Sequence, residues 1–250
     1  MTLIRSLLFN PLLWLWTAVM VFGCSPLLLG PGRWSMAAQN VWAAGTAALI
    51  RHVLGIRCEV RGRENLPEGP MIVASKHQSA YETVVFHQLL HDPGIVLKKE
   101  LLAIPLYGWF SRRMGMIPID RGGSARAMRV MLRAAEKVLA QGRPILIFPE
   151  GTRSTPGQPP RYHAGVAGLY RHLGVPVVPV ALNSGLLWGR RALVKRPGTV
   201  VFQYLPPIQP GLDRHAFMAE LELRIETATA ALLAEAGFHA VDKPVDELRG

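Results

Sequence analysis

From residue 53 onward, short apolar runs alternate with stretches that have the spacing of amphipathic helices. At the start of this region, Ile56, Cys58 and Val60 alternate with charged residues, which is typical of a half-exposed strand. Further strands are predicted by apolar runs at 71–74, 94–97, 144–148, 175–182 and 199–205. Strands that alternate with helices favour a sheet covered on both faces. We therefore expect an α/β domain over residues 53–250, with a mixed, largely parallel central sheet flanked by helices.

Three helices of this domain are predicted from capping residues and glycines. Ser124 is a candidate N-cap for a helix over 125–141. Asp213 is the corresponding residue for the last long helix, which ends at Gly237. A shorter helix is expected over 164–173. The inner face of the first helix is predicted to consist of apolar residues at helical spacing, namely Ala127, Val130, Met131, Ala134 and Val138.

The N-terminal part of the chain contains two long uncharged stretches separated by a Gly-Pro-Gly-Arg turn. Leu7–Gly30 is the more apolar of the two, and Trp34–Ile50 is milder. Pro11 and Pro26 bracket the most helical part of the first stretch, which leaves about fourteen residues and is short for a straight span. We predict that residues 1–52 form a two-helix hairpin that anchors the chain by inserting into a membrane or lying on it. A true single span is the alternative.

A second interpretation of the N-terminus is a cleaved signal sequence. Val21–Cys24 is similar to the cleavage site of a lipoprotein, and Arg5 supplies a weak positive start. Phe22 is bulky for such a site, however, and the chemistry described below requires cytosolic substrates. The hairpin is therefore the main prediction.

The chain carries a net charge of +11 that is unevenly distributed. Residues 151–211 hold seven basic side chains and no acidic one. Such a surface is expected to bind anions. The candidates are phosphate esters, anionic lipid head groups and nucleic acid. The sequence has no RNP-like, zinc-finger or helix-turn-helix signature, so a nucleic acid partner is not expected. The basic block Arg190–Arg196 either contacts anionic lipid or forms a solvated loop.

The segment Lys76–Glu82 follows the strand predicted at 71–74 and places a histidine five residues before a carboxylate. If His77 donates a hydrogen bond to Glu82, its tautomer is fixed and its other ring nitrogen can accept a hydroxyl proton. The same segment contains a capping box, in which Ser79 and Glu82 begin a helix and the histidine is an ordinary loop residue. The two interpretations are compatible. The sequence has no G-x-S-x-G elbow and no cysteine in a catalytic context, so the pair predicts direct transfer onto a substrate hydroxyl.

The segment Phe148–Ser154 follows the strand at 144–148 and combines a glycine, hydroxyl groups and an arginine. Gly151 allows close approach to the backbone, and Arg153 can hold a phosphate through two parallel hydrogen bonds. This loop predicts an anion site. The alternative is a structural turn in which Glu150 pairs with Arg153.

Four motifs, in this order and spacing, resemble those of the glycerophospholipid acyltransferases, the family that includes 1-acyl-sn-glycerol-3-phosphate acyltransferases. The H-x-x-x-x-D motif of the family corresponds to His77 and, with a departure, Glu82. The other three correspond to Gly115–Arg121, to the complete F-P-E-G-T-R-S of Phe148–Ser154, and to the apolar run Val177–Val180. The apolar N-terminal pair also fits, because family members are anchored on membranes by such helices.

This resemblance covers residues 56–210 and implies a glycerolphosphate acyltransferase-like fold and a particular reaction. It implies that His77 is the general base for the sn-2 hydroxyl of lysophosphatidic acid, and that Glu82 orients and polarises this base. The hydroxyl oxygen then attacks the thioester carbonyl of acyl-carrier protein or acyl-CoA, and the product is phosphatidic acid. The residues implied for the acyl acceptor are Glu150, Gly151, Thr152 and Arg153, with Arg121 and Lys98 as further phosphate ligands. For Arg121, a salt bridge with Asp120 is the alternative.

The resemblance also implies the other participants in the reaction. The co-substrate is an acyl thioester, and neither a cofactor nor a metal ion is expected. The partners are lysophosphatidic acid and a phospholipid membrane surface, and the location is the cytoplasmic face of the cell inner membrane. Met114 and Met116 either line an acyl tunnel or pack in the core. Two other functions stay open: acyl transfer to another lysophospholipid or lipid acceptor, and lipid binding at a membrane without catalysis.

Overall fold

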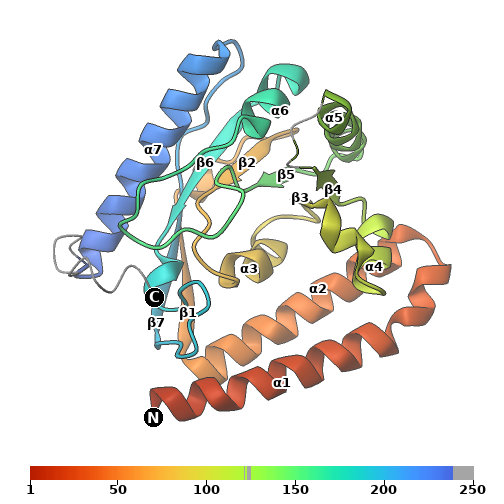
Figure 1. The fold of residues 1–250 in the computed structure, drawn as a ribbon, viewed down its shortest axis with the longest axis vertical. Helices are drawn as coiled ribbons and strands as arrows, with labels where there is room; N and C mark the ends of the chain where they lie inside the picture. The colour runs from red at the N-terminus through yellow and green to blue at the C-terminus, as the bar shows by residue number, and fades with distance from the viewer. Residues whose placement is uncertain (121, 123–124, 239–250) are drawn as a thin grey trace.

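The apolar runs of the sequence form the strands of a single sheet, as a computed structural model that describes residues 1–120, 122 and 125–238 shows (Figure 1). In chain order, the strands are β1 (Ile56–Arg61), β2 (Ile72–Ser75), β3 (Gly94–Lys98), β4 (Ile117–Ile119), β5 (Ile145–Ile147), β6 (Val177–Leu182) and β7 (Gly198–Tyr204). Their order across the sheet is β1-β7-β6-β2-β5-β3-β4. Neighbouring strands are parallel except β6 and β7, which are antiparallel. The predicted mixed, largely parallel sheet is therefore confirmed.

Helices lie on both faces of this sheet. In chain order, they are α1 (Thr2–Gly23), α2 (Gly32–Leu49), α3 (Tyr81–Leu89), α4 (Tyr107–Arg113), α5 (Ala125–Leu139), α6 (Gly165–Leu173) and α7 (Arg214–Glu235). Shorter helical segments are η1 (Ser25–Leu29), the π-helical turn η2 (Ile50–Leu54), η3 (Arg63–Asn65), η4 (Lys99–Ala103) and η5 (Ser184–Leu186).

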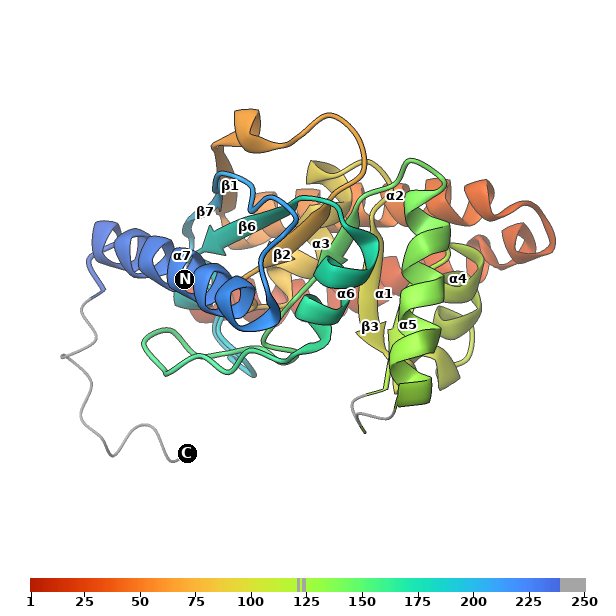
Figure 2. The same ribbon diagram turned by 90° about the horizontal axis from the view of Figure 1, so that it is seen from above.

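Helices cover the sheet from both sides (Figure 2), and a large apolar cluster lies beneath them on each face. A third, smaller cluster consists of Ala181, Val201 and Leu232. On one face, α5, α6 and α7 bury side chains such as Met131, Tyr170 and Phe217. On the other face, α3 contributes Phe86 and α1 contributes Phe9. Both faces of β2 and β5 are consequently covered, as expected for near-continuous apolar strands in a parallel sheet.

Two of the predicted helix features can be compared with the structure in detail. Asp213 caps α7, because its carboxylate accepts hydrogen bonds from the backbone N–H groups of His215 (2.7 Å) and Ala216 (2.9 Å). The predicted inner face of α5 is correct for Met131 but wrong for Val130, which is 49% exposed. The buried stripe of α5 continues through Ala135 and Val138, with the spacing of one helix face. The N-cap predicted at Ser124 lies outside the described residues.

The two N-terminal helices form a hairpin in which α1 and α2 lie side by side (Figure 1). Two indole groups link them: Trp16 Nε1 donates to the carbonyl of Trp42 (3.1 Å), and Trp42 Nε1 donates to Thr17 Oγ1 (3.1 Å). Among the described residues, α1 is the one helix that is long and apolar enough to cross a membrane.

The prediction that Pro11 limits the helical part of the first stretch is wrong. Helix α1 has 22 residues and continues through this proline. A proline removes one backbone hydrogen bond of a helix. When tertiary contacts fix the helix on both sides of the proline, the proline tends to kink the helix and not to end it. Here Phe9 is buried in the core on one side of the proline, and Trp16 is bonded to α2 on the other.

Candidate active site

The two sequence motifs come together because β2 and β5 are adjacent parallel strands. The loop after β2 contains His77, and the loop after β5 contains the segment 148–154. The carboxyl ends of parallel strands lie at one edge of a sheet, so the two loops meet there. Ser154 donates two hydrogen bonds to the carbonyl of His77, one from its backbone N–H (2.8 Å) and one from Oγ (3.1 Å).

His77 and Glu82 are hydrogen-bonded, with 2.9 Å between Nδ1 and Oε1. The side chain of Glu82 is fully buried in the first turn of α3, and that of His77 is 14% exposed. A carboxylate at this distance accepts the Nδ1 proton, which leaves Nε2, on the opposite side of the ring, as the proton acceptor. The predicted contact is therefore present.

The carboxylate of Glu82 also accepts three other hydrogen bonds. The backbone N–H groups of Gln78 and Ser79 both lie 2.6 Å from Oε1, and Ser184 Oγ donates to Oε2 (2.8 Å). Four donors compensate for the burial of this charge. The bond from the Ser79 N–H is one half of a capping box, while the hydroxyl of Ser79 accepts from Tyr81 N (3.1 Å). Glu82 therefore contacts the histidine as predicted. The predicted capping box is only half formed, because α3 begins at Tyr81 with Ala80, not Ser79, as its N-cap.

The ring of His77 stacks on Phe148, with 4.2 Å between centroids and 24° between planes. The aromatic residue that opens the second motif therefore limits rotation of the imidazole. Together with the Glu82 hydrogen bond, this contact fixes the direction in which Nε2 can accept a proton.

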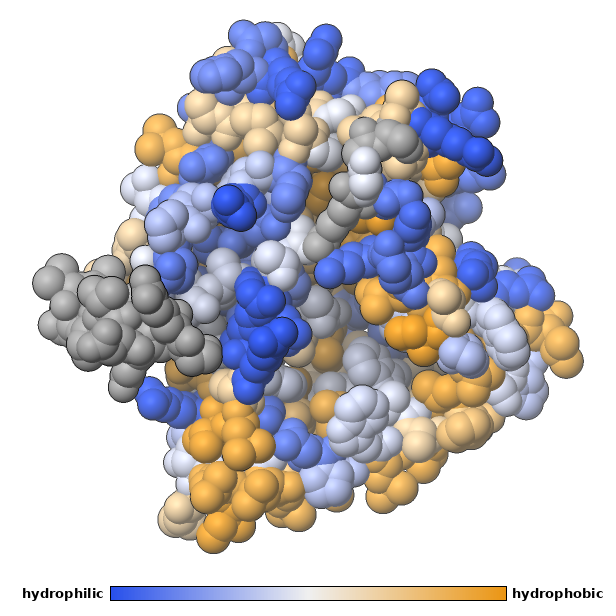
Figure 3. Space-filling model, viewed as in Figure 1, coloured by the Kyte–Doolittle hydropathy of each residue, from blue (hydrophilic) through white to orange (hydrophobic). Residues whose placement is uncertain are grey.

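A cavity of about 730 Å³ lies next to His77. Its wall contains five of the predicted site residues, namely His77, Lys98, Gly151, Thr152 and Arg153. The remaining wall is mostly apolar and includes Ile95, Leu101, Tyr107, Met114, Met116 and Met131. Figure 3 shows the molecule hollowed near the middle of the face seen there, with hydrophilic and hydrophobic residues on its borders. Basic groups, a histidine and an apolar wall thus share one space.

Glu150 occupies a different position from its neighbours in the motif. Its side chain is only 3% exposed, and it is absent from the described lining of the cavity. One carboxylate oxygen accepts the backbone N–H of His77 (2.9 Å), and the other lies 3.4 Å from Lys76 Nζ. Burial raises the pKa of Glu150, and the charge of Lys76 opposes this shift. The alternative in which Glu150 pairs with Arg153 is wrong, since among the described side chains its ion-pair partner is Lys76.

Arg121, the other predicted phosphate ligand, lies outside the described residues. Asp120, which precedes it, forms an ion pair with Lys99 at the edge of the cavity. This lysine lowers the pKa of the Asp120 carboxyl.

The basic block Arg190–Arg196 does not form one uniform surface. Lys195 is buried against α1, where its Nζ donates to Asn10 Oδ1 (3.1 Å) and lies 5.3 Å from the ring centroid of Trp188. Its backbone N–H donates to Ser6 Oγ (2.9 Å). Burial lowers the pKa of this lysine. One member of the block thus holds a loop on α1, while Arg190 and Arg191 are exposed.

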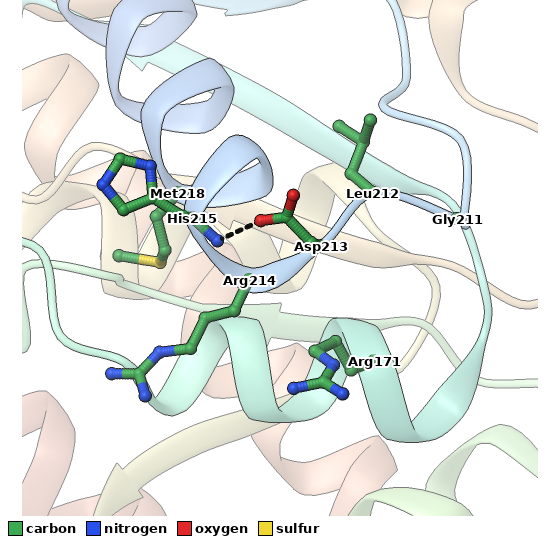
Figure 4. A pocket seen from close by; sticks show the side chains of 7 residues that line it. All are labelled: Arg171, Gly211, Leu212, Asp213, Arg214, His215 and Met218. Atoms are coloured by element: carbon green, nitrogen blue, oxygen red, sulfur yellow. Dashed lines mark hydrogen bonds between the residues drawn. The ribbon is translucent and has the colours of Figure 1, made fainter.

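A second hollow, of about 910 Å³, lies where α6 ends and α7 begins (Figure 4). It is lined by Arg171, Gly211, Leu212, Asp213, Arg214, His215 and Met218. The carboxylate of Asp213 is directed at the backbone of α7, which it caps (Figure 4). This hollow contains none of the motif residues, so we assign the candidate active site to the cavity beside His77.

Several residues of the site were not identified from the sequence. Ser184, which binds Glu82, comes 102 residues later in the chain and reaches it only because β6 lies beside β2. Lys76 immediately precedes His77 and lies within the first motif, but a lysine at the end of a strand is usually interpreted as a solvated residue. Glu226 and Tyr162, which contact Lys76 or its partner, carry no motif.

Comparison with known proteins identifies the family. A family model described as acyltransferase matches residues 57–183. The chain is 36% identical over 236 residues to the 1-acyl-sn-glycerol-3-phosphate acyltransferase of Pseudomonas aeruginosa, covering 93% of this chain and 91% of the relative. It is 30% identical over 206 residues to that of Saccharomyces cerevisiae, covering 80% and 68%. The chain belongs to the acyltransferase family, and the resemblance inferred from its four motifs is confirmed.

The fold has a counterpart among solved structures. The crystal structure of the 1-acyl-sn-glycerophosphate acyltransferase from Thermotoga maritima matches with a TM-score of 0.74, covering 94% of this chain and 98% of the other. At 22% sequence identity, this match shows that the two chains share a fold.

Proposed function

We propose that this protein transfers an acyl chain from a thioester to the sn-2 hydroxyl of lysophosphatidic acid and so produces phosphatidic acid. The observation that carries the proposal is the position of the His77–Glu82 pair at a cavity that also holds Arg153 and Lys98. This reaction requires a proton acceptor for the hydroxyl, cations for the phosphate and an apolar wall for the acyl chain. All three are present at the cavity. Relatives named 1-acyl-sn-glycerol-3-phosphate acyltransferase support the choice of acceptor.

The reaction is a direct displacement at the thioester. His77 Nε2 takes the proton of the sn-2 hydroxyl while the hydroxyl oxygen attacks the thioester carbonyl carbon. The new C–O bond forms, the C–S bond breaks, and the imidazolium returns its proton to the departing thiolate. Glu82 holds the Nδ1 proton throughout and stabilises the charged imidazolium. No protein nucleophile, metal ion or resident cofactor takes part.

The two substrates are assigned to different parts of the cavity. Arg153 and Lys98 bind the phosphate of the acceptor, with Gly151 and Thr152 beside them, and Arg121 is a further ligand. Glu150 belongs to the acceptor site through its hold on the backbone of His77, not through contact with the phosphate. The apolar wall around Met114 and Met116 accommodates acyl chain. The thiol part of the donor is coenzyme A or acyl-carrier protein.

The membrane is the remaining partner. Many apolar side chains of α1 are exposed, among them Leu3, Ile4, Leu7, Leu8, Trp14, Leu15, Val19 and Phe22. In Figure 3, hydrophobic residues gather along the edge of the molecule where α1 lies. We assign this edge to a phospholipid surface, on the cytoplasmic face of the cell inner membrane, where both the lysolipid and the cytosolic thioester are within reach.

A panel of acceptors tests the proposal. The purified chain is incubated in phospholipid vesicles with acyl-CoA or acyl-carrier protein and one of three acceptors: lysophosphatidic acid, lysophosphatidylcholine or glycerol 3-phosphate. We expect phosphatidic acid from the first acceptor, with much slower reaction of the other two. A preference for lysophosphatidylcholine would show a different lysolipid acceptor. Absence of transfer to any acceptor, from either donor, would support a lipid-binding protein without catalysis.

A further inference from the structure

Three charged side chains meet behind the loop that carries His77, and none of the three belongs to the described lining of the cavity. Lys76 Nζ lies 2.7 Å and 2.9 Å from the two carboxylate oxygens of Glu226, and 3.4 Å from Glu150 Oε2. The side chains of Lys76 and Glu150 are each 3% exposed, and that of Glu226 is 26% exposed. A buried lysine between two carboxylates is a feature that the proposed reaction does not use directly.

This charged cluster is connected to His77 through Glu150. The carboxylate oxygen of Glu150 that does not face Lys76 accepts the backbone N–H of His77 at 2.9 Å. The carbonyl of His77 is held by Ser154, as described above. The backbone on both sides of the imidazole is therefore fixed by the loop after β5, and one of these contacts depends on the orientation of a single carboxylate.

At its other end the cluster is fixed to α7. Glu226 accepts hydrogen bonds from Lys76 and from the hydroxyl of Tyr162 (2.8 Å), so its side chain has two partners from different segments. Removing one member of a buried charged pair leaves the other uncompensated. Without Glu226, Lys76 would have Glu150 as its remaining anionic partner. It would then compete with the backbone N–H of His77 for the same carboxylate.

We propose that Glu226 is a positioning residue for acyl transfer. It holds Lys76 at α7, and Lys76 in turn holds Glu150 in the orientation that binds the backbone of His77. This inference rests on the proposed function, because it requires His77 to act as the base. A misplacement of about 1 Å caused by a mutation far from the reacting atoms can cost about 10²-fold in rate.

The substitution Glu226→Gln tests this role, because glutamine has nearly the same shape and no charge. We expect kcat to fall about tenfold, which is less than the loss of about 10²-fold that a misplacement of about 1 Å can cause. KM for either substrate should change less than about twofold, since Glu226 does not belong to the described lining of the cavity. Glu226→Asp keeps the charge and should retain more activity than Glu226→Gln. Rates are expressed per folded enzyme, with folding checked by thermal melts.

Two further variants distinguish positioning from a general effect on the helix. Glu222→Gln removes a carboxylate one turn earlier on α7, and among the described residues no ion pair joins Glu222 to Lys76. It should retain the wild-type rate. Lys76→Met combined with Glu226→Gln should be no slower than Lys76→Met alone, because Glu226 acts through Lys76.

The outcomes separate this inference from the proposed function. If the wild-type chain fails to acylate lysophosphatidic acid, the proposed function is wrong. If the wild type is active and Glu226→Gln matches its kcat, or loses only substrate affinity, the positioning role is wrong and the function stands. The positioning role would also be contradicted if the double variant were slower than Lys76→Met by the factor that Glu226→Gln loses on its own. Should Glu226→Gln not fold, Tyr162→Phe removes one donor to Glu226 and should lower kcat at unchanged KM; an unchanged kcat would overturn the inference.

Discussion

Arg153 lies in the cavity wall, and its proposed partner is the phosphate of the acceptor. A charge-assisted hydrogen bond contributes about 1.5–3 kcal/mol. Arg153→Ala should therefore weaken acceptor affinity by about ten- to a hundred-fold and leave the apparent affinity for the thioester almost unchanged. Steady-state kinetics with each substrate varied in turn measure both quantities.

Arg161→Ala is the matched control, because this arginine is exposed in the same loop region and is not among the described residues that line the cavity. It should behave as the wild type. Equal losses for donor and acceptor in Arg153→Ala would contradict the phosphate role.

Substitutions of Glu82 test whether its carboxylate supports His77 as the base or only caps the start of α3. Glu82→Gln removes the charge that stabilises the imidazolium and can donate its amide hydrogen to Nδ1, which favours the wrong tautomer. We expect a loss of roughly 10²–10⁴ in turnover, which is the usual size of general-base assistance. In the serine proteases, the comparable neutral substitution costs about 10⁴-fold. Turnover is measured together with thermal melts that confirm folding.

Glu82→Asp supplies the comparison. It keeps the charge and shortens the reach, so it should retain measurably more activity than Glu82→Gln. If Glu82 acted only in a capping box, glutamine would serve about as well as glutamate. A folded glutamine variant with full activity would reduce Glu82 to a helix cap.

At the scale of residues, local spacing predicted part of the site. The five-residue separation of His77 and Glu82 spans one chain reversal, so their contact could be inferred without the fold. Ser184 could not be found in this way, since its contact with Glu82 depends on the strand order of the whole sheet. The orientation of Glu150 away from the cavity depends on Lys76 and was likewise not evident from the motif.

At the scale of elements, α1 is part of the folded core as well as a candidate membrane helix. Phe9 is fully buried and meets Trp188 edge to face, with 5.5 Å between ring centroids. Phe9→Ala should lower the free energy of unfolding by about 3–5 kcal/mol, the usual cost of removing a buried aromatic ring. Denaturant melts in mild detergent measure this change.

Leu8→Ala is the control for this prediction, because Leu8 precedes Phe9 on the same helix and is 53% exposed. Its free energy of unfolding should stay within about 0.5 kcal/mol of the wild type. Similar losses for Leu8→Ala and Phe9→Ala would mean that α1 is not docked as the structure has it.

Some features of the helices could be predicted from local sequence patterns, and others could not. The cap at Asp213 depends on backbone groups two and three residues away, and it could be predicted from the sequence. The path of α1 through Pro11 could not, because contacts with the core and with α2 on either side of the proline decide it. The exposure of Val130 shows that apolar residues at adjacent positions do not share one helix face.

At the scale of the whole molecule, the exposed apolar residues of α1 are proposed to be buried in lipid and not against the sheet. Each leucine-sized side chain buried in lipid contributes about 1.5–3 kcal/mol. Changing Ile4, Leu8 and Leu15 of α1 together to Asn should therefore lower partitioning into vesicles by more than about 10²-fold. Co-sedimentation with vesicles that contain anionic phospholipid measures this partitioning.

Leu223→Asn provides the control, because Leu223 is 64% exposed but lies on α7, a helix that packs on the opposite face of the sheet from α1. This variant should bind vesicles like the wild type. If it loses binding to the same extent, or if the triple variant keeps full binding, the membrane does not contact the molecule along α1.

The most direct test of the account is the rate at which His77→Ala converts lysophosphatidic acid to phosphatidic acid, measured beside the wild type in the same vesicles. Removing the His77 ring takes one hydrogen-bond donor from the buried carboxylate of Glu82 and a stacking partner from Phe148, so this variant should melt at a lower temperature than the wild type. It should still fold and bind vesicles like the wild type, because His77 lies in a loop. Loss of the base should lower turnover by roughly 10²–10⁴. A folded, membrane-bound His77→Ala variant that keeps more than about a tenth of the wild-type turnover, against this general-base effect, would contradict the central assignment.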